Sequence, residues 1–126
     1  MKHVKIAGLL FIGAVALVFL LPGSLAWSEN GVAVCTATQN QGKAIICADG
    51  QGGSFIAWVD SRSGIDEIFL QRLGPEGNLL WAANGIHISR DVTSDYNVQM
   101  VKASDDGVIL AWTRGGGTGA TCMPRR

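Results

Sequence analysis

Residues 54–81, with the sequence SFIAWVDSRSGIDEIFLQRLGPEGNLLW, contain the pattern that decides the fold. Positions 55–59 form a short apolar run rich in aromatic and β-branched side chains, with glycine and serine on either side. Both faces of this run are apolar, which is typical of a strand that is covered on both sides. A second strand is expected at 67–73, followed by a proline-glycine turn at 74–78 and a third at 79–81. The stretch therefore predicts an antiparallel meander that must bury at least one face.

The N-terminal segment, 1–26, has a different character from this meander. Lys2 and Lys5 form a basic start, and residues 6–21 are an unbroken apolar run of 16 positions. Ser24 and Ala26 then provide the small residues of a signal-peptidase site. We predict a signal helix and cleavage after Ala26, which places the chain outside the cell, in the periplasm or at the cell surface. The alternative is a retained membrane anchor, although a spanning helix needs about 20 apolar residues. An uncleaved signal is the only membrane contact we expect.

Removal of this segment changes the charge balance. The whole chain has 10 basic and 10 acidic residues, and loss of Lys2 and Lys5 leaves 8 against 10, a net charge of −2. A protein that binds a polyanion carries a basic patch or stripe. The composition therefore argues against nucleic acid as a partner.

An internal similarity appears when the mature sequence is shifted by 54 positions. The shift aligns six identical residues, among them two glycines and the pairs Trp27/Trp81 and Trp58/Trp112, and it also aligns apolar positions between them. One such unit would contain four strands, and parts of an earlier and a later unit would flank it. We expect the strands of the unit at 44–48, 54–60, 67–73 and 78–81, with a continuation near 86–88, and those of its neighbours at 32–34, 98–101 and 108–113. Four-stranded units that recur at 40–55 residues are typical of propeller blades.

The pattern AWVDSRSGIDEIFLQRLGPEGNLLWAANGIHI resembles secreted bacterial β-propeller repeats of the form W-x-D-x-R-x-G-x-x-D-I. It is similar, more loosely, to the Asp-box repeats of sialidase propellers, although residues 74–81 lack the serine and aspartate of that motif. The resemblance covers residues 27 to 112. It implies an all-β, partial β-propeller with one complete four-stranded antiparallel blade, flanked by pieces of its neighbours, after the signal helix. The expected organisation is a signal peptide at 1–26, a propeller-repeat region at 27–113 and a tail at 114–126.

The tail departs from the repeat. After Thr113 the pattern requires an aspartate-x-arginine turn, but residues 114–126 read RGGGTGATCMPRR. We expect this segment to be disordered, and we interpret the chain as the product of a truncated or frame-shifted gene. The exposed sheet faces of an incomplete propeller predict further propeller blades or self-association as partners.

The cysteines allow two interpretations. Export would place Cys35 and Cys47 in an oxidising compartment, where they could form a disulfide. The alternative, which we favour, is that both are small buried apolar side chains. Cys122 lies in the tail, no CxxC motif occurs, and His87 has no metal ligand at a suitable spacing, so the pattern argues against zinc.

The polar candidates are Asp60, Arg62 and Asp66, followed by Glu67. In a functional interpretation the aspartates bind calcium or a glycan at the end of a blade. In a structural one Asp60 accepts hydrogen bonds in the turn and pairs with Arg62. We favour the structural one, because these residues belong to the repeat. The glycine-rich loop at 49–53 is interpreted as a turn between strands.

The sequence contains no catalytic constellation. A sialidase needs a tyrosine–glutamate nucleophile, and the single tyrosine, Tyr96, is expected in a linker. We therefore expect a non-catalytic binding or surface-interaction module without a cofactor and with an unknown ligand. The alternatives are a fragment of a sialidase-like, carbohydrate-active propeller enzyme and a truncated product without function.

Overall fold

The computed structural model describes residues 27–89, 93–115 and 120–125. The expected signal helix at 1–26 and its cleavage site at Ala26 lie outside these residues. The described part of the chain is all-β and contains no helix, which confirms the all-β part of the prediction. No helix in these ranges is therefore long and apolar enough to cross a bilayer.

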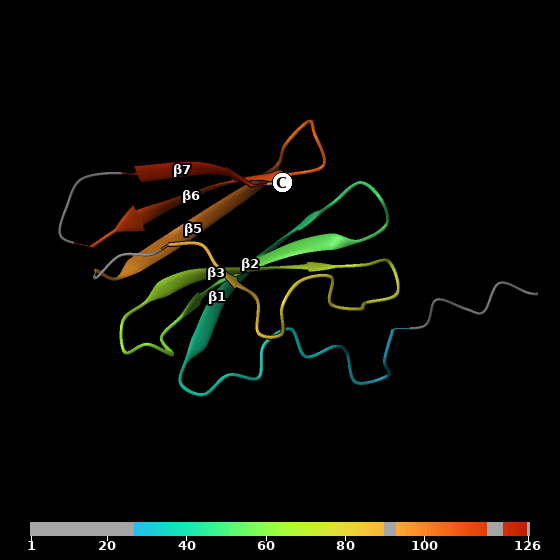
Figure 1. The fold of residues 1–126 in the computed structure, drawn as a ribbon, viewed down its shortest axis with the longest axis horizontal. Helices are drawn as coiled ribbons and strands as arrows, with labels where there is room; N and C mark the ends of the chain where they lie inside the picture. The colour runs from blue at the N-terminus through green and yellow to red at the C-terminus, as the bar shows by residue number, and fades with distance from the viewer. Residues whose placement is uncertain (1–26, 90–92, 116–119, 126) are drawn as a thin grey trace, which may run out of the picture.

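The first sheet has the antiparallel order β1-β2-β3-β4 (Figure 1). Its strands are β1 (Gln41–Ala48), β2 (Ser54–Asp60), β3 (Glu67–Leu73) and β4 (Ile86–His87). A four-stranded antiparallel sheet was predicted here, and β2 and β3 have the expected bounds.

The fourth strand differs from the expectation. Residues 78–81 form only an isolated bridge between Leu73 and Leu79, and the strand itself is the short β4, at the continuation expected near 86–88. The reason is the buried side chain of Gln71 in β3. Its Oε1 accepts a hydrogen bond from the backbone N–H of Trp81 at 3.1 Å, and its Nε2 donates to the carbonyl of Ala82 at 2.8 Å. A side chain thus replaces backbone pairing, and the chain bends away from the sheet.

A second sheet follows in the order β5-β6-β7, formed by β5 (Asp95–Lys102), β6 (Val108–Arg114) and β7 (Ala120–Arg125). Tyr96 therefore lies in a strand and not in a linker. β6 continues to Arg114, and within the expected tail the backbone of β7 pairs with β6 from Val108 to Thr113. The expected strand at 32–34 is also absent, and these residues form a loop before β1.

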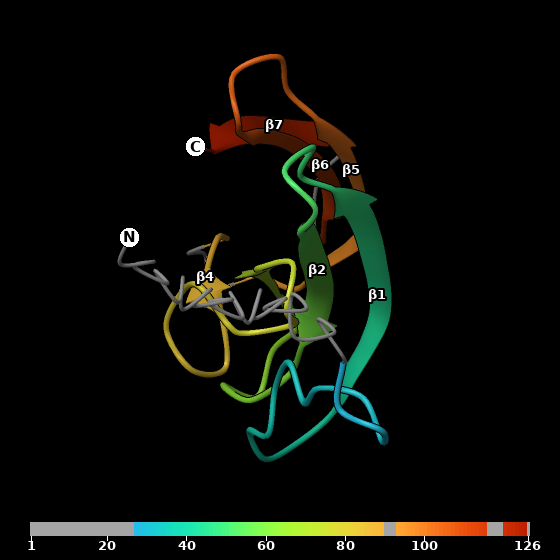
Figure 2. The same ribbon diagram turned by 90° about the vertical axis from the view of Figure 1, so that its right-hand side faces the viewer.

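The two sheets of the described chain share one apolar core. The second sheet lies over one face of the first (Figure 1), and β1 and β5 lie next to each other where the sheets meet (Figure 2). Odd-numbered side chains of β2 and even-numbered side chains of β6 point into this core, as the two-residue period of a strand requires. The buried members are Phe55, Ala57, Val59, Ile68, Leu70, Ile88, Val98, Val108, Leu110 and Trp112.

The hairpins β1–β2 and β5–β6 have the same backbone design at the shift of 54 positions. Their strands begin and end at corresponding places. Both ladders are irregular at the same point, between Gly42 and Ile45 in one and between Tyr96 and Gln99 in the other. A non-glycine residue with positive φ follows the start of each irregularity, Lys43 (53°) and its counterpart Asn97 (55°). A bulge that recurs with its unusual dihedral is a feature of the design and not a defect.

Candidate functional site: the Asp60–Arg62 cluster and the neighbouring cavity

The turn after β2 positions the polar candidates. The backbone N–H of Gly64 donates to the carbonyl of Ser61 at 2.9 Å, and Gly64 has φ 95°, a conformation that favours glycine. This turn carries Arg62 back over the sheet it has just left. Its side chain thereby lies beside Asp60, the last residue of β2.

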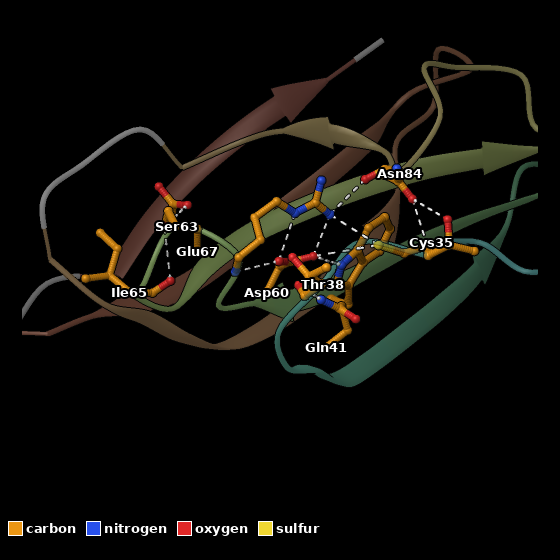
Figure 3. Close-up of polar contacts among 11 residues, drawn as sticks. Cys35, Thr38, Gln41, Asp60, Ser63, Ile65, Glu67 and Asn84 are labelled. Atoms are coloured by element: carbon orange, nitrogen blue, oxygen red, sulfur yellow. Dashed lines mark hydrogen bonds and ion pairs between the residues drawn. The ribbon is translucent and has the colours of Figure 1, made fainter.

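Asp60 is fully buried, and both its carboxylate oxygens accept hydrogen bonds (Figure 3). Its Oδ1 accepts from the backbone N and from Nε of Arg62, each at 2.9 Å. Its Oδ2 accepts from Arg62 at 2.5 Å and from the indole Nε1 of Trp58 at 2.9 Å. Burial on its own raises the pKa of Asp60, but the hydrogen bonds from Arg62 and Trp58 outweigh it and lower the pKa to about 2. The carboxylate is therefore ionised at neutral pH.

The guanidinium of Arg62 also makes several contacts within the protein. Besides Asp60 it donates to the carbonyl of Asn84 at 3.0 Å and to Sγ of Cys35 at 3.2 Å. Its plane lies over the ring of Phe69, with 3.9 Å from Cζ to the ring centroid. The hydrogen bond that it donates to Asp60 raises the pKa of Arg62 further. A pair with this many internal partners stabilises the loop and offers little to an external ligand.

A stack of side chains continues from this cluster. Phe69 and His87 are parallel, with centroids 4.8 Å apart, and Nε2 of His87 lies 3.0 Å from Oε1 of Glu67. The other oxygen of Glu67 accepts from the hydroxyl of Ser63 at 2.6 Å. The carboxylate thus lies between the hydroxyl and the imidazole. In a serine-hydrolase triad the imidazole must contact the hydroxyl directly, so this order does not activate Ser63.

The structure separates the third predicted site residue from the other two. Oδ1 of Asp66 accepts from the hydroxyl of Ser61 at 2.5 Å, and its carbonyl accepts from the backbone N–H of Asp95 at 2.6 Å. Asp66 therefore connects the turn to the second sheet. Asp60 pairs with Arg62 as the structural interpretation predicted. The described residues contain no group of three or more His, Cys, Asp and Glu side chains arranged to hold a metal ion.

The two described cysteines are free and half-buried. The disulfide between Cys35 and Cys47, which the sequence left open, is therefore not formed. Sγ of Cys35 accepts from Arg62, whereas Cys47 packs against the core, and burial raises the pKa of its thiol. Cys47 fits the expectation of a small apolar side chain, and Cys35 has a polar environment instead.

An apolar cavity of about 250 Å³ opens beside the cluster on the face of β1 and β2 away from the core. Its volume is slightly below the usual range for small-molecule sites, about 300–1,000 Å³. The space would accept one or two apolar side chains of a partner. Its lining consists of Val34, Cys35, Gln41, Gly42, Ala44, Ile56 and Trp58.

Some of these residues could not be recognised from sequence. Asn84 takes part through its carbonyl and also accepts at Oδ1 from the backbone N–H of Thr36 at 2.7 Å, and so fixes the loop that carries Cys35. The one signal was the Asn-Gly pair at 84–85, which recurs at the shift of 54. The contacts of Cys35 and Asn84 join residues 22 to 48 positions apart, and no local pattern predicts such contacts.

Comparisons of this chain with protein-family models, with curated proteins and with solved structures gave no match.

Proposed function

We propose that this chain is an exported β-propeller fragment that acts as a non-catalytic binding or surface-interaction module. The observation that carries this proposal is the apolar cavity beside a polar cluster in which Asp60 and Arg62 pair with each other and Arg62 also donates to Asn84. A surface of this kind recognises a partner through apolar contact. The hydrogen-bonded Asp60–Arg62 ion pair keeps the rim of the cavity rigid.

Three further observations support the proposal. The N-terminal segment has the composition of a secretory signal. The two hairpins share their register at the shift of 54 positions, and their sheets share one core. We place the module in the secreted, periplasmic or cell-surface compartment, and we expect further blades or a second copy as partner.

The export part of the proposal is tested by sequencing the N-terminus of the chain from the exported fraction of an expressing cell. We expect it to begin at Trp27. A chain that keeps Met1 and remains in the membrane fraction would contradict cleavage.

The binding part is tested with the apolar dye 1-anilinonaphthalene-8-sulfonate (ANS) and the full chain. Ala44 is exposed and lines the cavity, and its counterpart Val98 packs in the core between the sheets. The variant Ala44→Phe should fill the cavity and reduce dye binding several-fold. The matched control is Ala83→Phe, at an exposed position that does not line the cavity. Equal loss in both variants, or turnover of a fluorogenic sialoside by the wild type, would refute the proposal.

A further inference from the structure

The interface between the two sheets is asymmetric. The first sheet contributes the face that carries Cys47, Phe55 and Ala57, while the second contributes the face that carries Met100, Leu110 and Trp112. The shift of 54 positions does not align the residues of one of these faces with the residues of the other. The sheets therefore pack head to tail, in the arrangement called heterologous when it joins subunits.

The shift of 54 positions relates the second sheet's side of this interface to residues of the first sheet. In the described part of the chain, no sheet packs against those residues. Met100, Leu110 and Trp112 correspond to Ile46, Ile56 and Trp58, which share the face away from the core. We call residues 44, 46 and 56 the open face, because Trp58 lies on the same side but is only 3% exposed. Ile46 is 67% exposed, and the cavity of about 250 Å³ lies between the other members.

The counterparts of the other side lie on the second sheet. Cys47, Phe55 and Ala57 correspond to residues 101, 109 and 111, which we call the outer face. On this face Val101 is 58% and Ile109 36% exposed. All three residues, together with Gln99 and Met100, line a second cavity of about 290 Å³.

We propose that the open face of one copy of this chain binds the outer face of a second copy. The contact repeats between molecules the arrangement that already joins the two sheets within one molecule, with faces made of corresponding sequence positions. This inference rests on the proposed function, because it names the partner of the interaction module. After one contact forms, one copy keeps a free outer face and the other a free open face, so the contact closes into a ring or extends as a filament.

The internal interface favours this pairing over a symmetric one. Two open faces, if placed together, would oppose the same residues of both copies, and nothing in the described part of the molecule shows these residues packed on each other. The head-to-tail contact instead uses a geometry whose apolar side chains are buried inside the chain. It would also remove several exposed large apolar side chains from water at once.

The test uses the full chain and analytical ultracentrifugation over a range of concentrations. The variants are Ile46→Glu on the open face and Val101→Glu on the outer face. Both positions are exposed, so a carboxylate is solvated in the monomer and desolvated only in the assembly. The matched control is Leu80→Glu, at a position 47% exposed that belongs to neither face. Far-ultraviolet circular dichroism and urea unfolding verify that each variant is folded.

We expect wild type and Leu80→Glu to assemble with increasing concentration, and each face variant to remain monomeric, with self-association weakened more than about tenfold. A mixture of the two face variants should form a heterodimer, because one retains a native outer face and the other a native open face. Homodimers of Val101→Glu alone would indicate a symmetric contact and overturn the proposal.

The remaining outcomes separate this inference from the proposed function. A wild type that stays monomeric, binds ANS and loses the dye in Ala44→Phe would refute self-association and leave the interaction module supported. A monomeric wild type without dye binding would refute both.

Discussion

The hairpins β1–β2 and β5–β6 have the same backbone and different buried polar chemistry. In the first, Trp58 donates to Asp60, which Arg62 neutralises. In the second, the counterpart of Asp60 is Arg114, which instead pairs across the ladder with Asp95 at 3.2 Å. The indole N–H of Trp112 is consequently buried without a hydrogen-bond partner in the described part of the chain.

The difference shows which features tolerate sequence change. The register and bulge of the hairpin persist because apolar alternation and turn residues specify them. The polar network depends on single residues and is lost when one changes. Four experiments test this contrast, in order of decreasing effect.

The largest effect is expected for Arg62→Gln. The substitution leaves the carboxylate of Asp60 buried without its cation, and such a loss costs about 3–5 kcal/mol of unfolding free energy. Urea denaturation measures the change. The double variant Asp60→Asn/Arg62→Gln removes both charges and should lose less than Arg62→Gln alone. An equal loss would contradict a charge-based role for the pair.

The two tryptophans provide a matched pair. Trp58→Phe removes a hydrogen bond to a charged acceptor, which contributes about 1.5–3 kcal/mol, whereas Trp112→Phe removes a donor that has no partner among the described residues. Both variants lose the same ring area. We expect the free energy of unfolding to fall by about 2 kcal/mol more for Trp58→Phe, the middle of the range for such a bond. Equal losses would show that the indole–carboxylate bond contributes nothing.

Acid should weaken the first hairpin specifically. The folded protein lowers the pKa of Asp60 from 3.8 to about 2, so its contribution is complete above pH ~4 and disappears as the pH falls towards 2. The corresponding loss of stability is about 2 kcal/mol. The pKa of Asp49 is also lowered, through the hydrogen bonds that it accepts from Gln51 and Arg72. The measurement is therefore the difference in pH dependence between wild type and Asp60→Asn, and parallel curves would refute the assignment.

The smallest effect compares two glycines related by the shift of 54. Gly31 and Gly85 have φ of 78° and 80°, so alanine is strained at both. A Cβ at Gly31 would meet open space, whereas one at Gly85 would lie 2.4 Å from Cη2 of Trp58. We expect Gly85→Ala to cost about 1–2 kcal/mol more than Gly31→Ala in thermal or urea unfolding. A smaller difference in unfolding free energy would show that the loop at Gly85 shifts to accommodate the added Cβ.

Sequence reasoning predicted the strands of the first sheet well and its site in part. The bounds of β2 and β3 follow from alternation and flanking turns, and the pairing of Asp60 with Arg62 follows from a two-residue separation in a turn. The expected strand at 78–81 is wrong because Gln71 competes with the backbone ladder, whereas the continuation expected near 86–88 is β4. The composition of the tail did not indicate β7, because the pairing of β7 with β6 depends on the neighbouring strand.

The sequence by itself determined an all-β chain with two similar hairpins, since apolar alternation and glycine turns act over a few residues. Only the tertiary structure decided which faces pack and which stay free, and it alone brought Cys35 and Asn84 to Arg62. The reason is physical: strand formation depends on neighbours along the chain, whereas burial and charge pairing depend on neighbours in space.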